Sequence, residues 1–162
     1  YMMKIGSSVE YGMRVMVHLT KAGRCASAKG GSAFGGRVIP VTAEALSVSE
    51  NVPKDYVDQI LRRLRQAGLV ASVRGPAGGY VLAKPAAAIR VGDVVRAVKH
   101  EAFEAVCERF AEGQQTCGHQ GACGLHPVWK RLGALIEDYL NSVTLDQIQD
   151  QEESVFAKSL KE

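Results

Sequence analysis

Residues 53–82 decide the fold class of this chain: they read PKDYVDQILRRLRQAG (53–68) and then LVASVRGPAGGYVL (69–82). The first half predicts a helix that opens near Pro53 and ends at Gly68, because its apolar residues recur at helical spacing. That buried stripe consists of Val57, Ile60, Leu61 and Leu64. The second half predicts two short strands, Leu69–Arg74 and Tyr80–Leu82, because Gly-Pro and Gly-Gly separate two β-prone runs. A helix followed by a hairpin, or wing, is therefore expected.

A shorter helix is expected just before this one. Thr42 is a good capping residue, the helix runs through Leu46, and Ser47–Val52 forms the turn. Two short helices joined by a tight turn make a helix-turn-helix. With the wing, the pattern predicts a mainly α protein with a small β-hairpin, of the winged helix-turn-helix class.

Two helices and a loop precede or follow this unit. Apolar residues at helical spacing predict a first helix over Ser7–Thr20, and another helix over Ile89–Val98. Between the first helix and Thr42, the segment Ala22–Pro40 carries five glycines and no apolar period. We expect it to be an inserted loop, since it exceeds the usual length of about 2 to 8 residues for a connection between helices.

A long helix is expected over Pro127–Ser142, and its apolar stripe is broad. The stripe consists of Val128, Trp129, Leu132, Leu135, Ile136, Tyr139, Leu140 and Val143. Such a width favours a helix that packs both on its own domain and on a second subunit, although a lone core is the alternative. The chain is thus divided into a winged helix-turn-helix domain (3–98, with the insertion 22–40), a cysteine-bearing loop (99–126), a dimerisation helix (127–148) and an acidic tail expected to be flexible (149–162).

The charge distribution favours a nucleic-acid partner more than the net charge of +3 does. Basic residues concentrate between Pro53 and Arg74, whereas acidic residues dominate after Thr144. The basic set is Lys54, Arg62, Arg63, Arg65 and Arg74. Ordinary solvated helix surface is the alternative, but the wing that follows favours binding to double-stranded DNA. No apolar run of about 18 residues and no leader segment are present, so we expect a cytoplasmic protein without a membrane partner.

Cysteines and histidines gather in the loop before the long helix. They are Cys107, Cys117, His119, Cys123 and His126. Thiols in a glycine-bearing loop are poor candidates for core packing, and cytosolic disulfides are rare, so metal or redox chemistry is expected. An iron-sulfur cluster fits the gaps of nine and five residues. Zinc on three thiolates and His126 is an alternative without the usual Cys-x2-Cys pairs, and a thiol switch is another.

An enzyme is the least favoured function. Cys123 and His126 have the spacing of an activated thiolate and its base. Neither an orienting third group nor a substrate-binding motif accompanies them. The sequence therefore predicts a regulator and not an enzyme.

Several strings resemble the IscR/NsrR/RirA group of bacterial regulators over about residues 3–148. They are SVEYG (8–12), QIL with Leu64 (59–64), GLV (68–70), SVRGPAGGY (72–80) and the Cys117-x5-Cys123 loop before Trp129. The resemblance implies a homodimeric repressor or activator that senses iron, cluster supply, nitric oxide or redox state through a bound 2Fe-2S or 4Fe-4S cluster. It assigns operator contacts to Arg74 and Pro76 in the wing and to the recognition-helix region with Asp55, Tyr56, Asp58 and Gln59.

The same resemblance assigns the cluster to Cys107, Cys117 and Cys123 and leaves two candidates for the fourth ligand. His126 follows Cys123 in a Cys-x2-His arrangement, and Glu10 stands where other members present an acidic ligand from the partner subunit. Two departures from the group are the longer gap after Cys107 and the insertion at Ala22–Pro40. Cys25, inside that insertion, is not expected to be a ligand.

Overall fold

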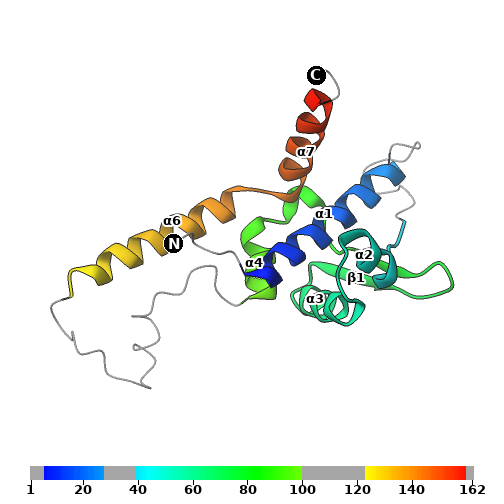
Figure 1. Ribbon diagram of the computed structural model, residues 1–162, viewed down its shortest axis with the longest axis horizontal. Coiled ribbons are helices and arrows are strands. Elements are labelled where there is room, and N and C mark those ends of the chain that lie inside the picture. The colour runs from blue at the N-terminus through cyan, green and yellow to red at the C-terminus, as the bar shows by residue number, and fades with distance from the viewer. Residues whose placement is uncertain (1–5, 28–38, 100–122, 160–162) are drawn as a thin grey trace.

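The computed structural model describes residues 6–27, 39–99 and 123–159, and these confirm the expected fold class (Figure 1). The elements are α1 (Ser7–Ser27), α2 (Ala43–Glu50), α3 (Lys54–Gln66), β1 (Val70–Val73), β2 (Gly79–Leu82), the 3-10 helix η1 (Ala86–Ala88), α4 (Val91–Val98), α6 (Leu125–Ser142) and α7 (Leu145–Ser159). Helices dominate, and the strands of the described residues form one two-stranded antiparallel hairpin. No helix in this part of the chain is long and apolar enough to cross a membrane.

One hydrophobic core joins α1, the helix-turn-helix pair α2–α3, and α4. Met16 of α1, Leu46 of α2, Leu61 of α3 and Val94 of α4 are all fully buried and belong to the same cluster. Each such side chain contributes about 1.5 to 3 kcal/mol on burial. The core therefore holds α3 in a fixed orientation relative to α1 and α4.

The turn between α2 and α3 is set by local hydrogen bonds. The Thr42 side chain accepts a hydrogen bond from the Ala45 amide at 3.1 Å, which confirms Thr42 as the cap of α2. Asn51 ends the helix in the left-handed region (φ 52°), and the Ser47 hydroxyl donates to the Val52 carbonyl at 2.6 Å. The expectation that α2 ends near Leu46 was wrong, because the helix continues to Glu50 and the turn is confined to the three residues before α3.

The wing has the expected strands and one unexpected partner. β1 and β2 pair antiparallel, from Val70 opposite Leu82 to Val73 opposite Gly79. Val41, just before α2, forms two further backbone hydrogen bonds with Tyr80, at 3.0 and 2.8 Å. This approach requires glycine beside it: a Cβ on Gly79 would lie 2.6 Å from the Val41 carbonyl oxygen. Strand β2 of the wing is thus tied to the residue that precedes the cap of α2.

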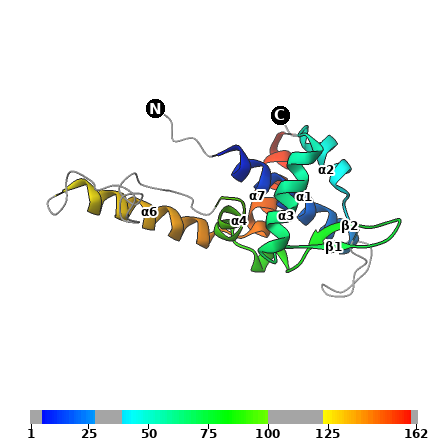
Figure 2. The same cartoon turned by 90° about the horizontal axis from the view of Figure 1, so that it is seen from below.

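Helix α6 is fixed at its C-terminal end and extends away from the rest of the fold (Figures 1 and 2). At the fixed end, the Val91 amide donates to the Val143 carbonyl at 2.9 Å, and the Leu145 amide donates to the Ile89 carbonyl at 3.0 Å. α6 has no fully buried residue. Apolar side chains along it are exposed, among them Val128 at 55% and Tyr139 at 69%.

Three expected boundaries differ from the structure. Ala22–Ser27, expected to begin a loop, continues α1; just before it, Thr20 is buried and Lys21 pairs with Glu152 of α7 at 2.6 Å. The expected dimerisation helix 127–148 is two helices, since the chain adopts an extended conformation at Val143. The tail from residue 149, expected to be flexible, is helical to Ser159 because Leu145 and Gln149 are buried against the domain.

Candidate DNA interface and cysteine site

The outer face of α3 carries the polar side chains that the sequence assigned to DNA. Residues opposite the buried stripe of this helix share one exposed face, as the helical period requires. They are Asp55, Asp58, Gln59, Arg62 and Gln66, all exposed. Tyr56 is half-buried, on the flank of the helix, and its ring meets Tyr11 of α1 edge-on with centroids 5.8 Å apart.

Lys54, at the start of α3, forms an ion pair with Glu44 of α2. The Nζ and Oε1 atoms are 2.5 Å apart, and both side chains are more than half exposed. The hydrogen bond from Lys54 holds the pKa of the Glu44 carboxyl below its usual value, and the same bond raises the pKa of Lys54. Lys54 therefore stays charged but has a carboxylate competing with any phosphate for its ammonium group. Sequence reasoning missed this pair, whose only signal was an acidic residue in the first turn of α2.

Arg63 contacts the protein itself. Its Nη1 atom donates a hydrogen bond to the Val98 carbonyl oxygen at 2.7 Å, which joins α3 to the last residue of α4. The sequence placed Arg63 among the candidate DNA contacts, and nothing in the linear pattern signalled this bond, because the two residues are 35 positions apart.

The turn of the wing exposes the residues expected to reach DNA. Arg74 and Pro76 are both exposed at the far end of the hairpin, which Figure 2 shows extending past α3. Gly75 adopts φ 116°, a conformation that side-chain-bearing residues rarely take. A Cβ on Gly78 would lie 2.3 Å from the Val73 carbonyl oxygen. The glycines therefore fix a tight turn that leaves Arg74 exposed at the end of the hairpin.

Only one of the three candidate cluster thiols lies in the described residues. Cys123 is a free, half-buried cysteine two residues before the start of α6, and His126 is exposed in the first turn of that helix. Cys107, Cys117 and His119 lie outside the described residues. Cys25 belongs to the last turn of α1. Among the described residues, no group of three or more His, Cys, Asp or Glu side chains is placed to hold a metal ion.

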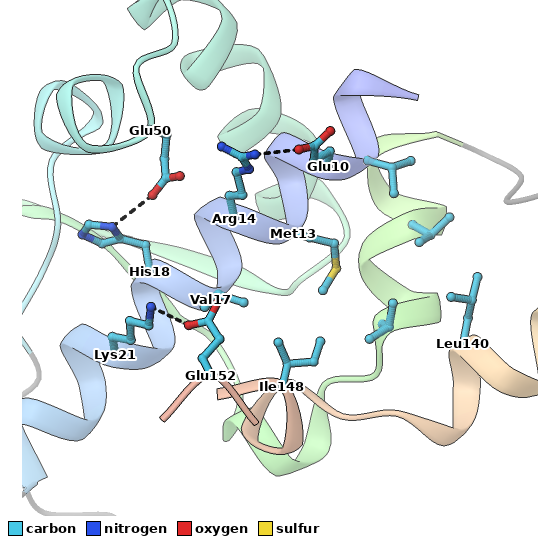
Figure 3. Close-up of a pocket in the computed structure, with 13 residues that line it drawn as sticks. Glu10, Met13, Arg14, Val17, His18, Lys21, Glu50, Leu140, Ile148 and Glu152 are labelled. Atoms are coloured by element: carbon cyan, nitrogen blue, oxygen red, sulfur yellow. Dashed lines mark hydrogen bonds and ion pairs between the residues drawn. The ribbon is translucent and has the colours of Figure 1, made fainter. Parts of the chain in front are cut away.

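Glu10, the second candidate for a fourth ligand, lines a hollow of about 450 Å³ between α1, α4 and the α6–α7 corner (Figure 3). Its carboxylate accepts a hydrogen bond from Arg14 Nη2 at 2.6 Å, and the Arg14 guanidinium lies 5.7 Å from the centre of the Tyr11 ring. The floor of the hollow is apolar, and charged groups stand around it. The apolar residues are Val9, Met13, Val17, Val91, Val95, Leu140 and Ile148.

Glu10 and Cys123 of one chain are far apart. Leu140, near the fixed end of α6, lines the same hollow as Glu10, whereas Cys123 precedes the opposite end of that helix. The fifteen helical steps from Leu125 to Leu140, at about 1.5 Å of rise each, correspond to about 22 Å. His126 can therefore serve a metal at Cys123 of its own chain, whereas Glu10 can do so only across a subunit boundary.

A helix-turn-helix joined to a glycine-shaped wing, with polar and basic side chains on the exposed face of the second helix, defines a winged helix-turn-helix DNA-binding protein. The chain belongs to the Rrf2 family, whose model is described as an iron-dependent transcriptional regulator and matches residues 5–151.

Relatives agree with this assignment. The chain is 40% identical over 114 residues to the HTH-type transcriptional regulator IscR of Pectobacterium atrosepticum, covering 70% of this chain and 67% of that one. It is 38% identical to IscR of Yersinia pseudotuberculosis over the same length. Similar solved structures include T. potens IscR (TM-score 0.66, 26% identity, 94% and 90% coverage of this chain and that one) and CymR, the global cysteine regulator of B. subtilis (0.64, 26%, 93% and 98%). These proteins are transcription regulators and not enzymes, and so is this chain.

Proposed function

We propose that this regulator is a homodimer that binds an operator and senses iron, cluster supply, nitric oxide or redox state through an iron-sulfur cluster held by Cys107, Cys117 and Cys123. The observation that carries the proposal is the free Cys123 thiol, three residues before His126 and next to a helix whose other end is fixed to the DNA-binding domain, in a family described as iron-dependent.

The donor set fits such a cluster. Three thiolates with one imidazole or carboxylate are a recognised way to hold iron and sulfide. Cys123 is accessible and in no disulfide, and His126 lies within one helical turn of it. When bound, the cluster supplies an electron-transfer and ligand-exchange centre. The chain's own residues hold the cluster and connect it to the DNA-binding domain.

On DNA, the exposed face of α3 enters the major groove and the wing reaches the flanking backbone or minor groove. Arg62 and Gln59 lie on the face opposite the core, where base edges and phosphates are reached. Arg74 and Pro76 stand at the exposed turn of the hairpin. Asp55, Tyr56 and Asp58 lie at the start of α3, next to the bound DNA. Lys54 contacts a phosphate once its ion pair with Glu44 opens.

The second copy packs along α6. This helix presents large apolar side chains to solvent, including Leu135 at 49% and Tyr139 at 69% exposure. The hollow beside Glu10 offers an apolar floor continuous with Leu140 of the same helix. Association through α6 covers the stripe, and it also brings the Cys123 end of one chain toward Glu10 of the other.

Anaerobic purification tests the cofactor. We expect a brown protein with iron and acid-labile sulfide, both lost in a Cys123→Ser variant that keeps the far-ultraviolet circular dichroism of the wild type. A colourless protein with equimolar zinc would establish instead the zinc-stabilised regulator that the sequence left open. A protein with neither would leave a thiol switch.

The fourth ligand is tested by His126→Ala and Glu10→Ala, each reconstituted anaerobically and compared by absorption and paramagnetic resonance. The variant that changes the spectrum or the cluster lifetime identifies the ligand. If Glu10 is that ligand, mixing Glu10→Ala with Cys123→Ser subunits restores one site per mixed dimer, because the two residues belong to different chains. If neither variant differs from the wild type, both assignments are wrong.

DNA binding is tested by titrating an operator-containing duplex with the loaded and the cluster-free protein at fixed salt. We expect the two forms to differ in affinity, with a typical coupling of about 5- to 150-fold. Equal affinities would contradict a sensing role while leaving DNA binding itself intact.

A further inference from the structure

Helix α6 depends on a few contacts for its direction relative to the DNA-binding domain. It contains no fully buried residue, and near its fixed end Leu140 packs against the core beside α4 (Figure 3). The backbone bonds of Val143 and Leu145 fix the chain just after the helix. Bonds beyond the end of a helix hold that end in place but leave the angle of the helix axis open. The direction of α6 therefore depends on side chains of its last turn.

Asn141, the neighbour of Leu140 in that turn, is bonded to α4. Its Oδ1 atom accepts a hydrogen bond from Arg96 Nη2 at 3.0 Å, and the same nitrogen donates to Asp93 Oδ1 at 2.9 Å. The other oxygen of Asp93 accepts a hydrogen bond from the Arg90 amide at 3.1 Å, at the start of α4. The half-buried Asn141 side chain thus belongs to a bonded network on the surface of α4.

Gly92 of α4 leaves the space that the Asn141 side chain occupies. Gly92 is buried, and a Cβ there would overlap Asn141 Oδ1 and lie 3.1 Å from Asn141 Cγ. Alanine favours a helix more than glycine does, so glycine at this position serves the close approach of α6. Adjacent residues of a helix lie about 100° apart around its axis, so Leu140 and Asn141 restrain α6 in two directions.

The angle of α6 matters for DNA because this helix is also the proposed dimer interface. In a dimer joined along α6, each DNA-binding domain is attached at the fixed end of its own α6. The distance between the two recognition helices therefore follows from the angle between α6 and its domain. The 18 residues of α6 span about 27 Å, so a tilt of about 10° displaces one end relative to the other by about 5 Å. One base pair adds about 3.4 Å along DNA, so such a tilt changes which spacing of half-sites fits.

We propose that Asn141 is a positioning residue, whose contacts with Gly92 and Arg96 fix the angle of α6 and so make the regulator selective for the distance between operator half-sites. The inference rests on the proposed homodimer, and it adds a specificity-determining residue that lies outside the DNA interface. It requires no movement within the core that α1, α3 and α4 share, because only the direction of α6 changes.

The test compares the spacing selectivity of Asn141→Ala and Ser142→Ala. Ser142 is the matched control, since its hydroxyl donates to the Tyr139 carbonyl of the same helix at 2.7 Å. The probe is a duplex that the wild-type protein selects from random sequence, with versions that gain or lose one base pair at the centre. We expect the wild type and Ser142→Ala to prefer the selected spacing. Asn141→Ala should lose about 2- to 12-fold of that preference, which corresponds to one ordinary hydrogen bond.

Gly92→Ala reaches the same contact from the other helix. The added carbon displaces the Asn141 side chain from Arg96, so this variant should lose spacing preference as Asn141→Ala does. In the double variant Gly92→Ala/Asn141→Ala, the space for the added carbon is free again. The double variant should therefore lose no more preference than Asn141→Ala alone, and it should have a higher melting temperature than Gly92→Ala.

Affinity for a duplex that carries one half of the selected site separates positioning from general damage. It should equal that of the wild type in every variant, because α3 and the wing are unchanged. The inference is overturned if Asn141→Ala keeps the wild-type spacing preference, or if it loses affinity equally for all duplexes. A wild-type dimer without preference among the spacings would also overturn it and leave the proposed function intact. A wild-type monomer in sedimentation would instead refute the proposed homodimer, and the inference with it.

Discussion

Replacement of Gly12 by alanine should destabilise the protein by an amount that the α1–α4 contact determines. The added Cβ would lie 2.9 Å from Val98 Cγ1 and 3.4 Å from Cγ2. Carbon atoms pack best at about 3.5 to 4.0 Å, so one helix must shift by roughly half an ångström or more. Overpacking of this kind typically costs about 1 to 3 kcal/mol.

Gly23, in the same helix, provides the control. A Cβ there meets no atom within 4 Å, so Gly23→Ala should stabilise α1 by about 1 kcal/mol through helix propensity alone. Gly12→Ala gains the same propensity, and the difference between the two variants isolates the clash. We expect Gly12→Ala to be less stable than Gly23→Ala by about 1 to 3 kcal/mol in urea unfolding, or about 2 to 12 °C in melting temperature.

The double variant identifies the partner. Val98→Ala removes both γ-carbons, and the remaining Val98 Cβ lies 3.6 Å from the added carbon, an ordinary contact. In that background, Gly12→Ala should cost nothing relative to Gly23→Ala, so the double-mutant cycle should give a favourable coupling of about 1 to 3 kcal/mol. Additive costs, or equal stability of the two alanine variants in the wild-type background, would refute the close approach of α1 and α4.

Other substitutions test the interface, the dimer and the ligand region. Arg74→Ala should weaken operator binding by about 1 to 3 kcal/mol without changing the melting temperature, and unchanged affinity at fixed salt would remove the wing from the interface. Leu135→Lys should dissociate the dimer in sedimentation at micromolar concentration, whereas Glu137→Lys on the exposed side of α6 should not. Glu44→Gln should free Lys54 and steepen the salt dependence of non-specific DNA binding by about one unit, and an unchanged slope would mean that Lys54 does not approach DNA. If Glu10 is a cluster ligand, Arg14→Ala should lengthen the cluster lifetime up to about fivefold, because the exposed Arg14–Glu10 ion pair that competes with ligation is worth about 0 to 1 kcal/mol. If His126 is the ligand instead, Arg14→Ala should leave the cluster lifetime unchanged.

Local periodicity and turn residues were sufficient to predict the helix-turn-helix and the wing. The stripe of α3 and the glycines around Arg74 act within a few residues, so their consequences are visible in the linear pattern. Thr42 as a cap and Gly68 as a stop were correct for the same reason. The continuation of α1 past Lys21 was not predictable, because Ala22–Ser27 carries no apolar period and the partner of Lys21, Glu152, is 131 positions away in the chain.

The candidate site was predictable in residue type but not in contacts. The exposed face of α3 follows from helical geometry, so Gln59 and Arg62 were identified correctly as exposed. Arg63 was grouped with them because it is charged and adjacent, although its partner is a carbonyl on α4. Backbone acceptors have no signature in a sequence. A charged residue that bonds the end of a distant helix therefore cannot be distinguished, from the sequence, from one that contacts DNA.

The two ends of the cysteine segment lead into different parts of the molecule. Val98 is fixed between α1 and α3, whereas Cys123 precedes the end of α6 that extends from the fold. The cluster that we propose would join Cys107 to Cys123 and so close a loop of chain between these two parts, and the metal-thiolate bonds would offset the entropy cost of that closure.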